Sequence, residues 1–475
     1  MASLACPRCL RRSLQDLETT ATAIRPQRAA FSTSPSLSAN PPKKKAVVAK
    51  PSTRQGSALR LTKNTRATNT RPPAVGERKE LRKKVVLSNT NALEVLGLND
   101  LSKENLSSDA LHALEAKVMG FGDTSVDRLR ALKAFKPTQG WNLFRRPASL
   151  VRKETTHLLG DIEWVEAGQG SRTVRKVLYG ERGSGKSVLQ LQALAMASLK
   201  GWFVIHIPEA MDLTIAHTSY QPVTTPGGPT RYAQAHFACK LLRNIRDANN
   251  HLLSNLRISG EHDIPGQLKP GASLLGLVDV GVKEPARAWP VWQILWEELT
   301  LPSAQSKGGP RPPIMFTMDG IDHIMRLSAY LNAEAQPIHA HDLLLPRHFI
   351  ELLSGRETLP NGGMVLGAVS ESNRAASHTL DHALARNEAI QNELTPPAWD
   401  PWVKYDKNVQ DAMEGVGVQR LQGLSKEEAR GIMEYYARSG LIRKAVTSGL
   451  ISEAWTLAGG GIIGEIEKGT VKARV

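Results

Sequence analysis

The stretch that decides the fold is Leu178-Tyr179-Gly180-Glu181-Arg182-Gly183-Ser184-Gly185-Lys186-Ser187. It fits the pattern G-x-x-x-x-G-K-[ST], in which glycines let successive backbone N–H groups converge on phosphate oxygens. Lys186 brings a positive charge to those phosphates, and Ser187 offers its hydroxyl to Mg²⁺ at the positive end of the next helix. The pattern predicts a phosphate-binding site made of Gly180, Glu181, Arg182, Gly183, Ser184, Gly185, Lys186 and Ser187.

Both flanks of this loop fit the strand, loop and helix order that phosphate binding requires. Residues 174–179 form a plausible short strand, and residues 188–199 carry apolar side chains at helical spacing before Gly201. The alternative is an ordinary Gly/Ser turn, because patterns of this length also occur by chance. The flanks favour the phosphate-binding loop.

A second candidate position ends the apolar run that begins at Pro313. This run ends in Asp319, 133 residues after Lys186. P-loop proteins use an aspartate at a strand end to hold Mg²⁺ opposite the loop hydroxyl, usually through water. The predicted metal-binding residues are therefore Ser187 and Asp319.

No catalytic residue is predicted beside this aspartate. Hydrolytic relatives of the AAA type follow the aspartate with a glutamate that activates water, but Gly320 occupies that position. Asp322 would have to reach back to act as a base. We therefore expect a bound nucleotide to be hydrolysed very slowly, and Gly320→Glu to leave stability nearly unchanged.

Polar residues also follow a third apolar strand, residues 363–369. Ser370 could sense a γ-phosphate or its attacking water, and it is a candidate nucleotide-binding residue. It could equally be a turn former at the strand end, and the sequence leaves both readings open.

Strands alternate with helices from residue 160 to 375, with candidate ligand-binding residues at the strand ends. This order predicts an α/β fold, a P-loop NTPase of AAA-like class with a parallel sheet. A capping box at Ser425 opens a helix over 426–439 in a helical C-terminal lid. The predicted segments are 1–40 presequence, 41–87 basic disordered extension, 88–159 N-terminal helical segment, 160–375 nucleotide-binding domain and 376–475 lid.

Further elements are predicted inside these segments. The apolar run 202–208 is typical of a central parallel strand, and 232–256 is long and periodic enough for a helix. Tryptophans 289, 292 and 296 fall on one amphipathic helix, 287–299, and indicate core or a partner interface. In the N-terminal segment, helical patterns cover 92–96, 109–118 and 126–135.

The positive charge of the chain is concentrated at its N-terminus. Residues 1–84 hold 19 Lys and Arg against four acidic residues, whereas the formal charge of the whole chain is +16. Residues 1–40 have the Arg-, Ser- and Ala-rich composition of a mitochondrial presequence, with predicted cleavage near residues 29–33. Residues 41–84 lack aromatics, so we expect a disordered arm that binds RNA phosphates without stacking on bases.

The sequence argues against a disulfide-rich protein and against a membrane-spanning one. Three cysteines in 475 residues make no disulfide framework. No apolar run approaches the ~18 residues needed for a membrane span.

The chain resembles the family of mitochondrial small-subunit ribosomal proteins called death-associated protein 3, in a fungal-looking form. The resemblance runs from about Phe144 to the C-terminus. It rests on the loop 180–187, the strand 202–208, the Met318-Asp319-Gly320 strand end and the run Leu424–Tyr436.

The resemblance implies a nucleotide-binding component of the mitochondrial ribosome in the mitochondrial matrix. Its implied partners are the small-subunit rRNA, neighbouring small-subunit proteins and, as a bridge, the large subunit. It implies GTP or GDP with Mg²⁺. No Asn-Lys-x-Asp guanine box is present, so ATP stays open.

Two other functions are compatible with the sequence. One is a mitochondrial AAA-like ATPase acting on DNA or protein, for which the glutamate after Asp319 is missing. The other is a GTP-binding signalling protein of the apoptotic type, which would act away from the ribosome.

Overall fold

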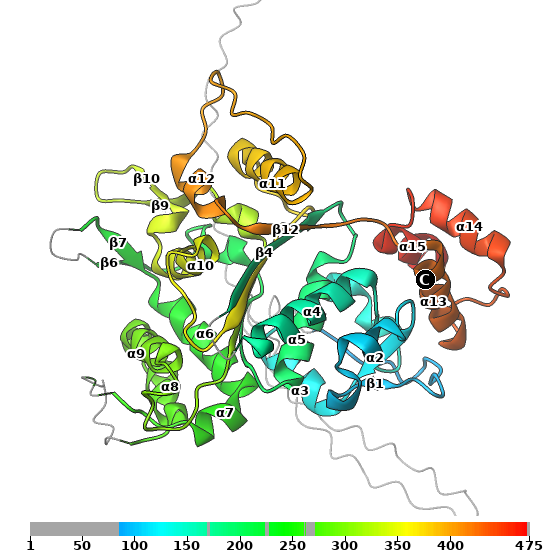
Figure 1. Cartoon of the computed structure of the whole chain (residues 1–475), viewed down its shortest axis with the longest axis horizontal. Helices are drawn as coiled ribbons and strands as arrows, with labels where there is room; N and C mark the ends of the chain where they lie inside the picture. The colour runs from blue at the N-terminus through cyan, green and yellow to red at the C-terminus, as the bar shows by residue number, and fades with distance from the viewer. Residues whose placement is uncertain (1–84, 169–171, 224–227, 261, 263–270, 473–475) are drawn as a thin grey trace, which may run out of the picture. The chain divides into compact units, whose positions relative to one another are not determined.

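A five-stranded parallel sheet forms the centre of the computed structural model (Figure 1). The structure describes residues 85–168, 172–223, 228–260, 262 and 271–472. The predicted presequence, 1–40, and the basic arm, 41–84, lie outside these residues. The strands, in spatial order, are β12 (Gly417–Leu421), β4 (Thr173–Gly180), β11 (Gly363–Ala368), β8 (Ile314–Asp319) and β5 (Phe203–Ile207).

The three strands β11, β8 and β5 are buried along their whole length, as their continuous apolar runs predict. The prediction that 202–208 is a central strand is wrong, because β5 lies at an edge of the sheet. Its residues are apolar because both of its faces pack into the core. The parallel register places Ala368 of β11 beside both Leu178 and Asp319. The strand ends that follow these residues therefore meet at one edge of the sheet.

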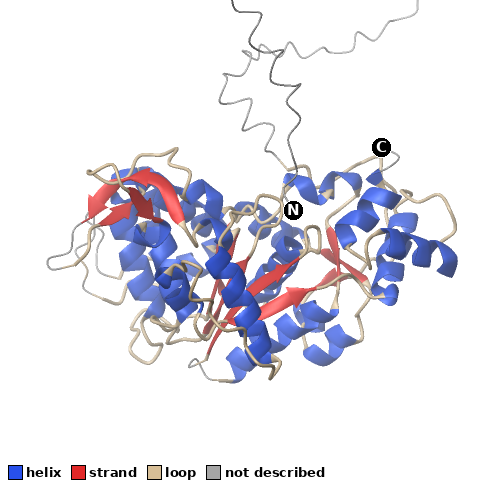
Figure 2. Cartoon of the chain, turned by 90° about the horizontal axis from the view of Figure 1, so that it is seen from above, coloured by secondary structure: helices blue, strands red, loops and turns tan. Residues whose placement is uncertain are grey.

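Helices cover both faces of the sheet (Figures 1 and 2). On one face, α4 (Lys153–Ala167) and α5 (Lys186–Leu199) pack with Leu178, Val204 and Met315. The other face, which includes Phe203 and Phe316, packs against helices that belong mainly to the long connection between β5 and β8. The predicted parallel α/β architecture is confirmed.

The connection between β5 and β8 contains two helices where the sequence predicted one over 232–256. These are α6 (Ala235–Ala248) and α7 (Asn250–Asn255). Between them, the Asn249 amide accepts from Val204 N at 2.9 Å and donates to Val204 O at 2.8 Å. Its side chain thus pairs with the edge strand β5 where the helix is interrupted.

The remaining elements between β5 and α11 are short hairpins and helices. They are the hairpin β6 (Gln221–Val223) with β7 (Arg231–Ala233), α8 (Leu274–Lys283), α9 (Ala288–Thr300), the hairpin β9 (Leu327–Leu331) with β10 (Pro337–His339), and α10 (Leu344–Ser354). Short 3-10 helices lie at Ala210–Leu213, Pro285–Arg287, Ile321–His323 and Ala340–Asp342.

The N-terminal segment differs from the helical prediction, because it contains a small sheet. Its strands are β1 (Asp100–Leu101), β2 (Val118–Phe121) and β3 (Ala148–Leu150). The helices are α2 (Ser108–His112) and α3 (Asp123–Ala131), with 3-10 turns at Lys103–Asn105, Pro137–Gln139 and Trp141–Leu143. The predicted helix at 92–96 is wrong, since these residues form turns and irregular chain.

The C-terminal segment is helical but also supplies the edge strand β12 of the central sheet. Its helices are α11 (His378–Gln391), α12 (Lys407–Met413), α13 (Lys426–Arg438), α14 (Ser448–Leu457) and α15 (Ile463–Thr470). The capping box is present, with the Ser425 hydroxyl accepting from Glu428 N at 3.1 Å. Helices α13 to α15 share a core that also includes Phe144.

Two of the three tryptophans of α9 lie in the core. Trp292 donates to His348 Nδ1 at 2.9 Å, and Trp296 donates to Glu357 Oε1 at 2.6 Å. Both indoles also pack near Phe316 of β8. The structure therefore supports the core reading for Trp292 and Trp296.

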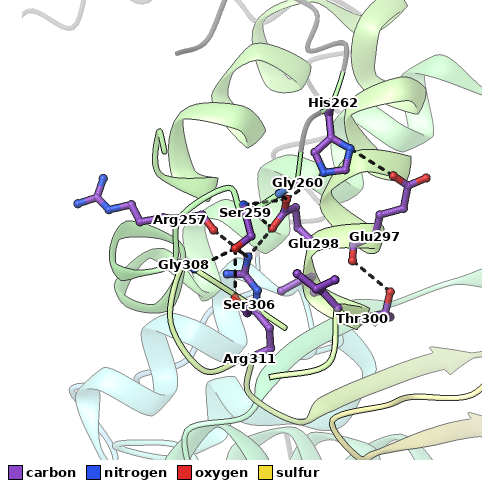
Figure 3. Close-up of polar contacts among 12 residues, drawn as sticks. Arg257, Ser259, Gly260, His262, Glu297, Glu298, Thr300, Ser306, Gly308 and Arg311 are labelled. Atoms are coloured by element: carbon purple, nitrogen blue, oxygen red, sulfur yellow. Dashed lines mark hydrogen bonds and ion pairs between the residues drawn. The ribbon is translucent and has the colours of Figure 1, made fainter. Parts of the chain in front are cut away.

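Helix α9 also carries a buried carboxylate, Glu298, at the centre of a polar network (Figure 3). Glu298 accepts from Ser259 N at 2.9 Å and from Gly260 N at 2.7 Å, and it is ion-paired with buried Arg311. His262 Nε2 lies 2.9 Å from the same carboxylate. The network holds chain segments on either side of α9 against this helix.

Among the described residues, no helix combines the length and the apolar character needed to cross a membrane.

Candidate functional site

The predicted phosphate-binding loop lies between β4 and α5, at the edge of the sheet where strands β4, β8 and β11 end (Figure 1). Strand β4 ends at Gly180 and helix α5 begins at Lys186, as the flanks of the motif predicted. A Cβ atom at Gly180 would lie 2.4 Å from the carbonyl oxygen of Leu421. Only glycine allows β12 to end this close to the loop.

Lys186 is folded back onto the loop. Its Nζ donates to the carbonyls of Gly180 at 2.7 Å and Glu181 at 2.8 Å. Burial lowers the pKa of the Lys186 amine, while the charges of Glu371 and Asp319 oppose that shift. An ammonium has three N–H donors, so carbonyls of the loop satisfy two of them.

The loop also holds an unpaired hydroxyl. Ser184 is 1% exposed, and its Oγ has no hydrogen-bond partner among the described residues. A buried hydroxyl without a partner is unfavourable by about 1–3 kcal/mol. A phosphate oxygen bound in the loop would remove this penalty, so the residues present fit a bound phosphate group.

The two predicted metal-binding residues are in direct contact. Ser187 Oγ donates to Asp319 Oδ2 at 2.6 Å, although Ser187 lies in helix α5 and Asp319 ends strand β8. Asp319 is 2% exposed. A hydroxyl and a carboxylate at one point are suitable oxygen ligands for Mg²⁺, with phosphate oxygens and water completing its shell.

The residue that follows Asp319 is fixed by its backbone. Gly320 has φ +76°, in the left-handed region that disfavours other residues. The nearest atom to a Cβ built there is 3.6 Å away, so space is not the constraint. The expectation that Gly320→Glu leaves stability nearly unchanged is therefore wrong, because the side chain would impose backbone strain.

Asp322 has a structural role at this edge of the sheet. Its carboxylate accepts from Ser370 N and Ala375 N, both at 2.8 Å, and it is fully buried. It therefore orders the loop after β11.

Ser370 lies at the same edge, close to Gly320. Its Cβ is 3.9 Å from the position of a Cβ at Gly320. Its Oγ lies 3.3 Å from Ser372 Oγ, a contact within the turn. These contacts support a role in the turn, while its place beside the predicted metal site keeps the nucleotide-sensing role as a proposal.

Sequence reasoning missed two basic residues that reach the site from the N-terminal segment. Lys136 forms an ion pair with Asp319 Oδ2. Arg152, buried at the start of α4, donates to Ser184 O at 2.7 Å and to Gln422 O at 2.9 Å. Neither residue belongs to a recognisable motif, and only the folded chain places them here.

The C-terminal helix also touches the loop. Gly464 N, at the start of α15, donates to Gly183 O at 3.0 Å. The predicted phosphate-binding loop is thus bordered by the N-terminal segment and by helix α15.

Comparison with known proteins gives one family. A protein-family model described as "Mitochondrial ribosomal death-associated protein 3" matches residues 149–469. A Neurospora crassa protein named small ribosomal subunit protein mS29 is 42% identical over 409 residues, which are 84% of this chain and 83% of that protein. Proteins of the same name are 22% identical in Schizosaccharomyces pombe, over 70% of this chain and 67% of that protein, and 24% identical in Bos taurus, over 42% and 49%.

Two solved structures show more distant similarity. The Aeropyrum pernix ORC2 protein (ADPNP-ADP complexes) has a TM-score of 0.33 and 14% identity, covering 68% of this chain and 61% of that chain. A chain of the E. coli MS115-1 HORMA:CdnC:Trip13 complex has a TM-score of 0.25 and 13% identity, covering 74% of this chain and 82% of that chain.

Proposed function

The chain belongs to the mitochondrial ribosomal death-associated protein 3 family, and from this membership we propose that it is a structural component of the mitochondrial ribosome. The names of its relatives support a place in the small subunit. The proposed location is the mitochondrial matrix. The proposed partners are small-subunit rRNA and neighbouring small-subunit proteins, with a contact to the large subunit.

The proposal includes a bound purine nucleotide with Mg²⁺, held by a P-loop NTPase fold of AAA-like class. The observation that carries it is the hydrogen bond between Ser187 and Asp319 at the mouth of the glycine-rich loop. Backbone N–H groups of residues 183–187 and the Lys186 amine would hold the phosphates, while Ser187 and Asp319 would hold the metal. Guanine is favoured by the family resemblance, and ATP stays an alternative.

We propose that the nucleotide is a structural ligand with slow turnover. Mg²⁺ would neutralise phosphate charge when bound. No carboxylate follows Asp319, and the buried Asp322 carboxylate is engaged by the N–H groups of Ser370 and Ala375. Positioning of the attacking water is a large part of phosphoryl-transfer catalysis, so its loss favours binding over hydrolysis.

Sedimentation tests the ribosomal part of this proposal. The full-length chain and its Lys186→Ala variant would be expressed in mitochondria, and small subunits would be isolated after high-salt washing. We expect the unaltered chain to remain with the subunit and the variant to be incorporated less. A chain that is washed off the subunit entirely would favour the rival ATPase or signalling functions.

Single-turnover hydrolysis by the purified chain tests the structural-ligand part. We expect a rate far below ~1 per second, the lower end of ordinary enzyme turnover. A faster rate would contradict the proposal and favour the ATPase alternative.

A further inference from the structure

Asp319 has a second contact that the phosphate-loop pattern does not explain. Ser187 Oγ and Lys136 Nζ both contact the same carboxylate oxygen, Oδ2. Asp319 is 2% exposed, whereas the Lys136 side chain is 29% exposed. A buried carboxylate needs a cation nearby, because desolvation without a partner is strongly unfavourable.

Neighbouring basic groups do not take this role. His206, at 3% exposure, has a pKa lowered to about 4 by burial, so its imidazole is neutral at pH 7. The Lys186 amine donates to the carbonyls of Gly180 and Glu181. Among the described residues, the cation that forms an ion pair with Asp319 is Lys136.

Lys136 is supplied by a turn outside the central sheet, and the turn is well anchored. Lys136 N donates to Gln139 Oε1 at 2.8 Å, and the indole of Trp141 donates to the same oxygen at 2.7 Å. Trp141 is buried and packs edge to face on Phe135, with ring centroids 5.1 Å apart. The backbone at Lys136 is therefore held, while its long, partly exposed side chain can change partner.

The position of the Lys136 amine conflicts with a metal ion. It contacts Asp319 Oδ2, the oxygen that Mg²⁺ would use directly or through a water, and two cations beside one carboxylate oxygen would repel each other. Mg²⁺ held at this oxygen would therefore displace the amine from it. In the absence of the metal, it keeps the carboxylate neutralised and remains close to the phosphate loop.

We propose that Lys136 is a tethered cation that competes with Mg²⁺ for Asp319, so that the chain binds nucleotide with a reduced dependence on the metal. This inference rests on the proposed function, since it concerns the same site. It adds a binding residue from the N-terminal segment, which the loop motif does not contain. The inference also means that the contact between Lys136 of the N-terminal segment and Asp319 would depend on bound metal.

Nucleotide binding at two metal concentrations tests the proposal. The dissociation constant of a fluorescent GDP analogue would be measured for the full-length chain in millimolar Mg²⁺ and in excess EDTA. The measured ratio is the dissociation constant in EDTA divided by the dissociation constant in Mg²⁺. For Lys136→Met, we expect this ratio to be ~10-fold or more above that of the unaltered chain, which corresponds to about 1.4 kcal/mol of coupling between Lys136 and the metal. Lys136→Arg should keep a ratio close to that of the unaltered chain.

Lys117→Met is the matched control, because it removes an exposed lysine of the same segment whose amine donates only to Ala113 O in the described structure. Its ratio should not change. An unchanged ratio in Lys136→Met, with binding intact, would overturn this inference and leave the proposed function standing. Absence of nucleotide binding in every protein, the unaltered chain included, would overturn the proposed function and this inference with it.

A second measurement needs no nucleotide. Unfolding by urea would be compared for Lys136→Met, Asp319→Asn and the double variant. We expect Lys136→Met to lower the free energy of unfolding of the unaltered chain by more than it lowers that of Asp319→Asn. In Asp319→Asn, the neutral amide leaves no carboxylate charge for the Lys136 amine to balance. Additive effects of the two substitutions would contradict the ion pair on which the competition depends.

Discussion

At the scale of single residues, Gly320 shows how the backbone limits the chemistry of the site. Gly320 directly follows Asp319, and its φ of +76° lies in the left-handed region. A carboxylate introduced there would have to adopt a strained conformation. This φ favours glycine at the position where the AAA-type sequence pattern has glutamate.

We predict that Gly320→Ala and Gly320→Glu each lower the free energy of unfolding by ~1–2 kcal/mol, the usual cost of a left-handed residue with a Cβ. Gly320→Asn should lose less, because asparagine tolerates this region better. Urea unfolding of the three variants is the measurement. Equal stability of Gly320→Ala and the unaltered chain would show that the backbone is not constrained as described.

His348 gives a pH-dependent prediction at the same scale. Burial lowers the pKa of His348 to about 3, and its Nδ1 accepts a hydrogen bond from Trp292. The unfolded chain therefore binds this proton below pH 6.5 while the folded chain does not, and stability falls as the pH falls. From pH 7 to pH 5 the loss from this residue is about 2 kcal/mol.

Comparison with His348→Gln isolates the loss of stability that is due to His348, since glutamine keeps an acceptor for Trp292 and does not titrate. The variant should lose about 2 kcal/mol less between these two pH values, measured by urea unfolding at each pH. The same loss in both proteins would mean that folding does not lower the pKa of His348.

At the scale of elements, the buried network around Glu298 attaches two chain segments to α9 (Figure 3). Arg311 balances the Glu298 charge, and both side chains are almost fully buried. We predict that Arg311→Met lowers the free energy of unfolding by ~3–5 kcal/mol, because it leaves a buried carboxylate without its cation.

The double variant Glu298→Gln, Arg311→Met tests the reason for that loss. Removing the carboxylate charge as well should recover part of the stability lost in Arg311→Met, as measured by chemical denaturation. If the double variant is less stable than Arg311→Met, packing by the two side chains matters more than their charges.

The elements also show what the sequence could predict. Strands β5, β8 and β11 were recognisable because each is a continuous apolar run buried on both faces. Strands β1 to β3 have two to four residues each, which is too short for a periodic signal. Strand β12, Gly417-Val-Gln-Arg-Leu421, is polar at two positions and only partly buried, so it has no continuous apolar run to recognise.

The same limit applies to the candidate site. The loop 180–187 and Asp319 carry a local pattern, and the structure brings Ser187 and Asp319 together as that pattern predicts. Lys136 and Arg152 carry none, since each is an ordinary basic residue until the N-terminal segment packs beside the sheet. A sequence motif identifies only the site residues that stand in a recognisable local pattern. Tertiary packing brings the other residues, Lys136 and Arg152, to the site.

At the scale of the whole molecule, the charge is divided between the nearly neutral residues 85–475 and a basic N-terminus. Residues 41–84 contain 14 Lys and Arg against two glutamates. We predict that deletion of 41–84 weakens binding to small subunits that lack this protein and reduces the salt dependence of binding, because fewer phosphate counterions are released. Binding at two salt concentrations measures both effects, and an unchanged salt slope would contradict a role in gripping RNA.

The central claim is that this member of the family holds a nucleotide in the loop 180–187 as a stabilising ligand. Its most direct test is chemical unfolding of the full-length chain and of Lys186→Ala, with and without Mg²⁺ and guanine or adenine nucleotide. At ~100 times the dissociation constant, bound nucleotide should raise the free energy of unfolding of the unaltered chain by about 2.7 kcal/mol. Lys186→Ala should show little of this increase. No stabilisation of the unaltered chain by either nucleotide, or the same stabilisation in both proteins, would contradict the claim.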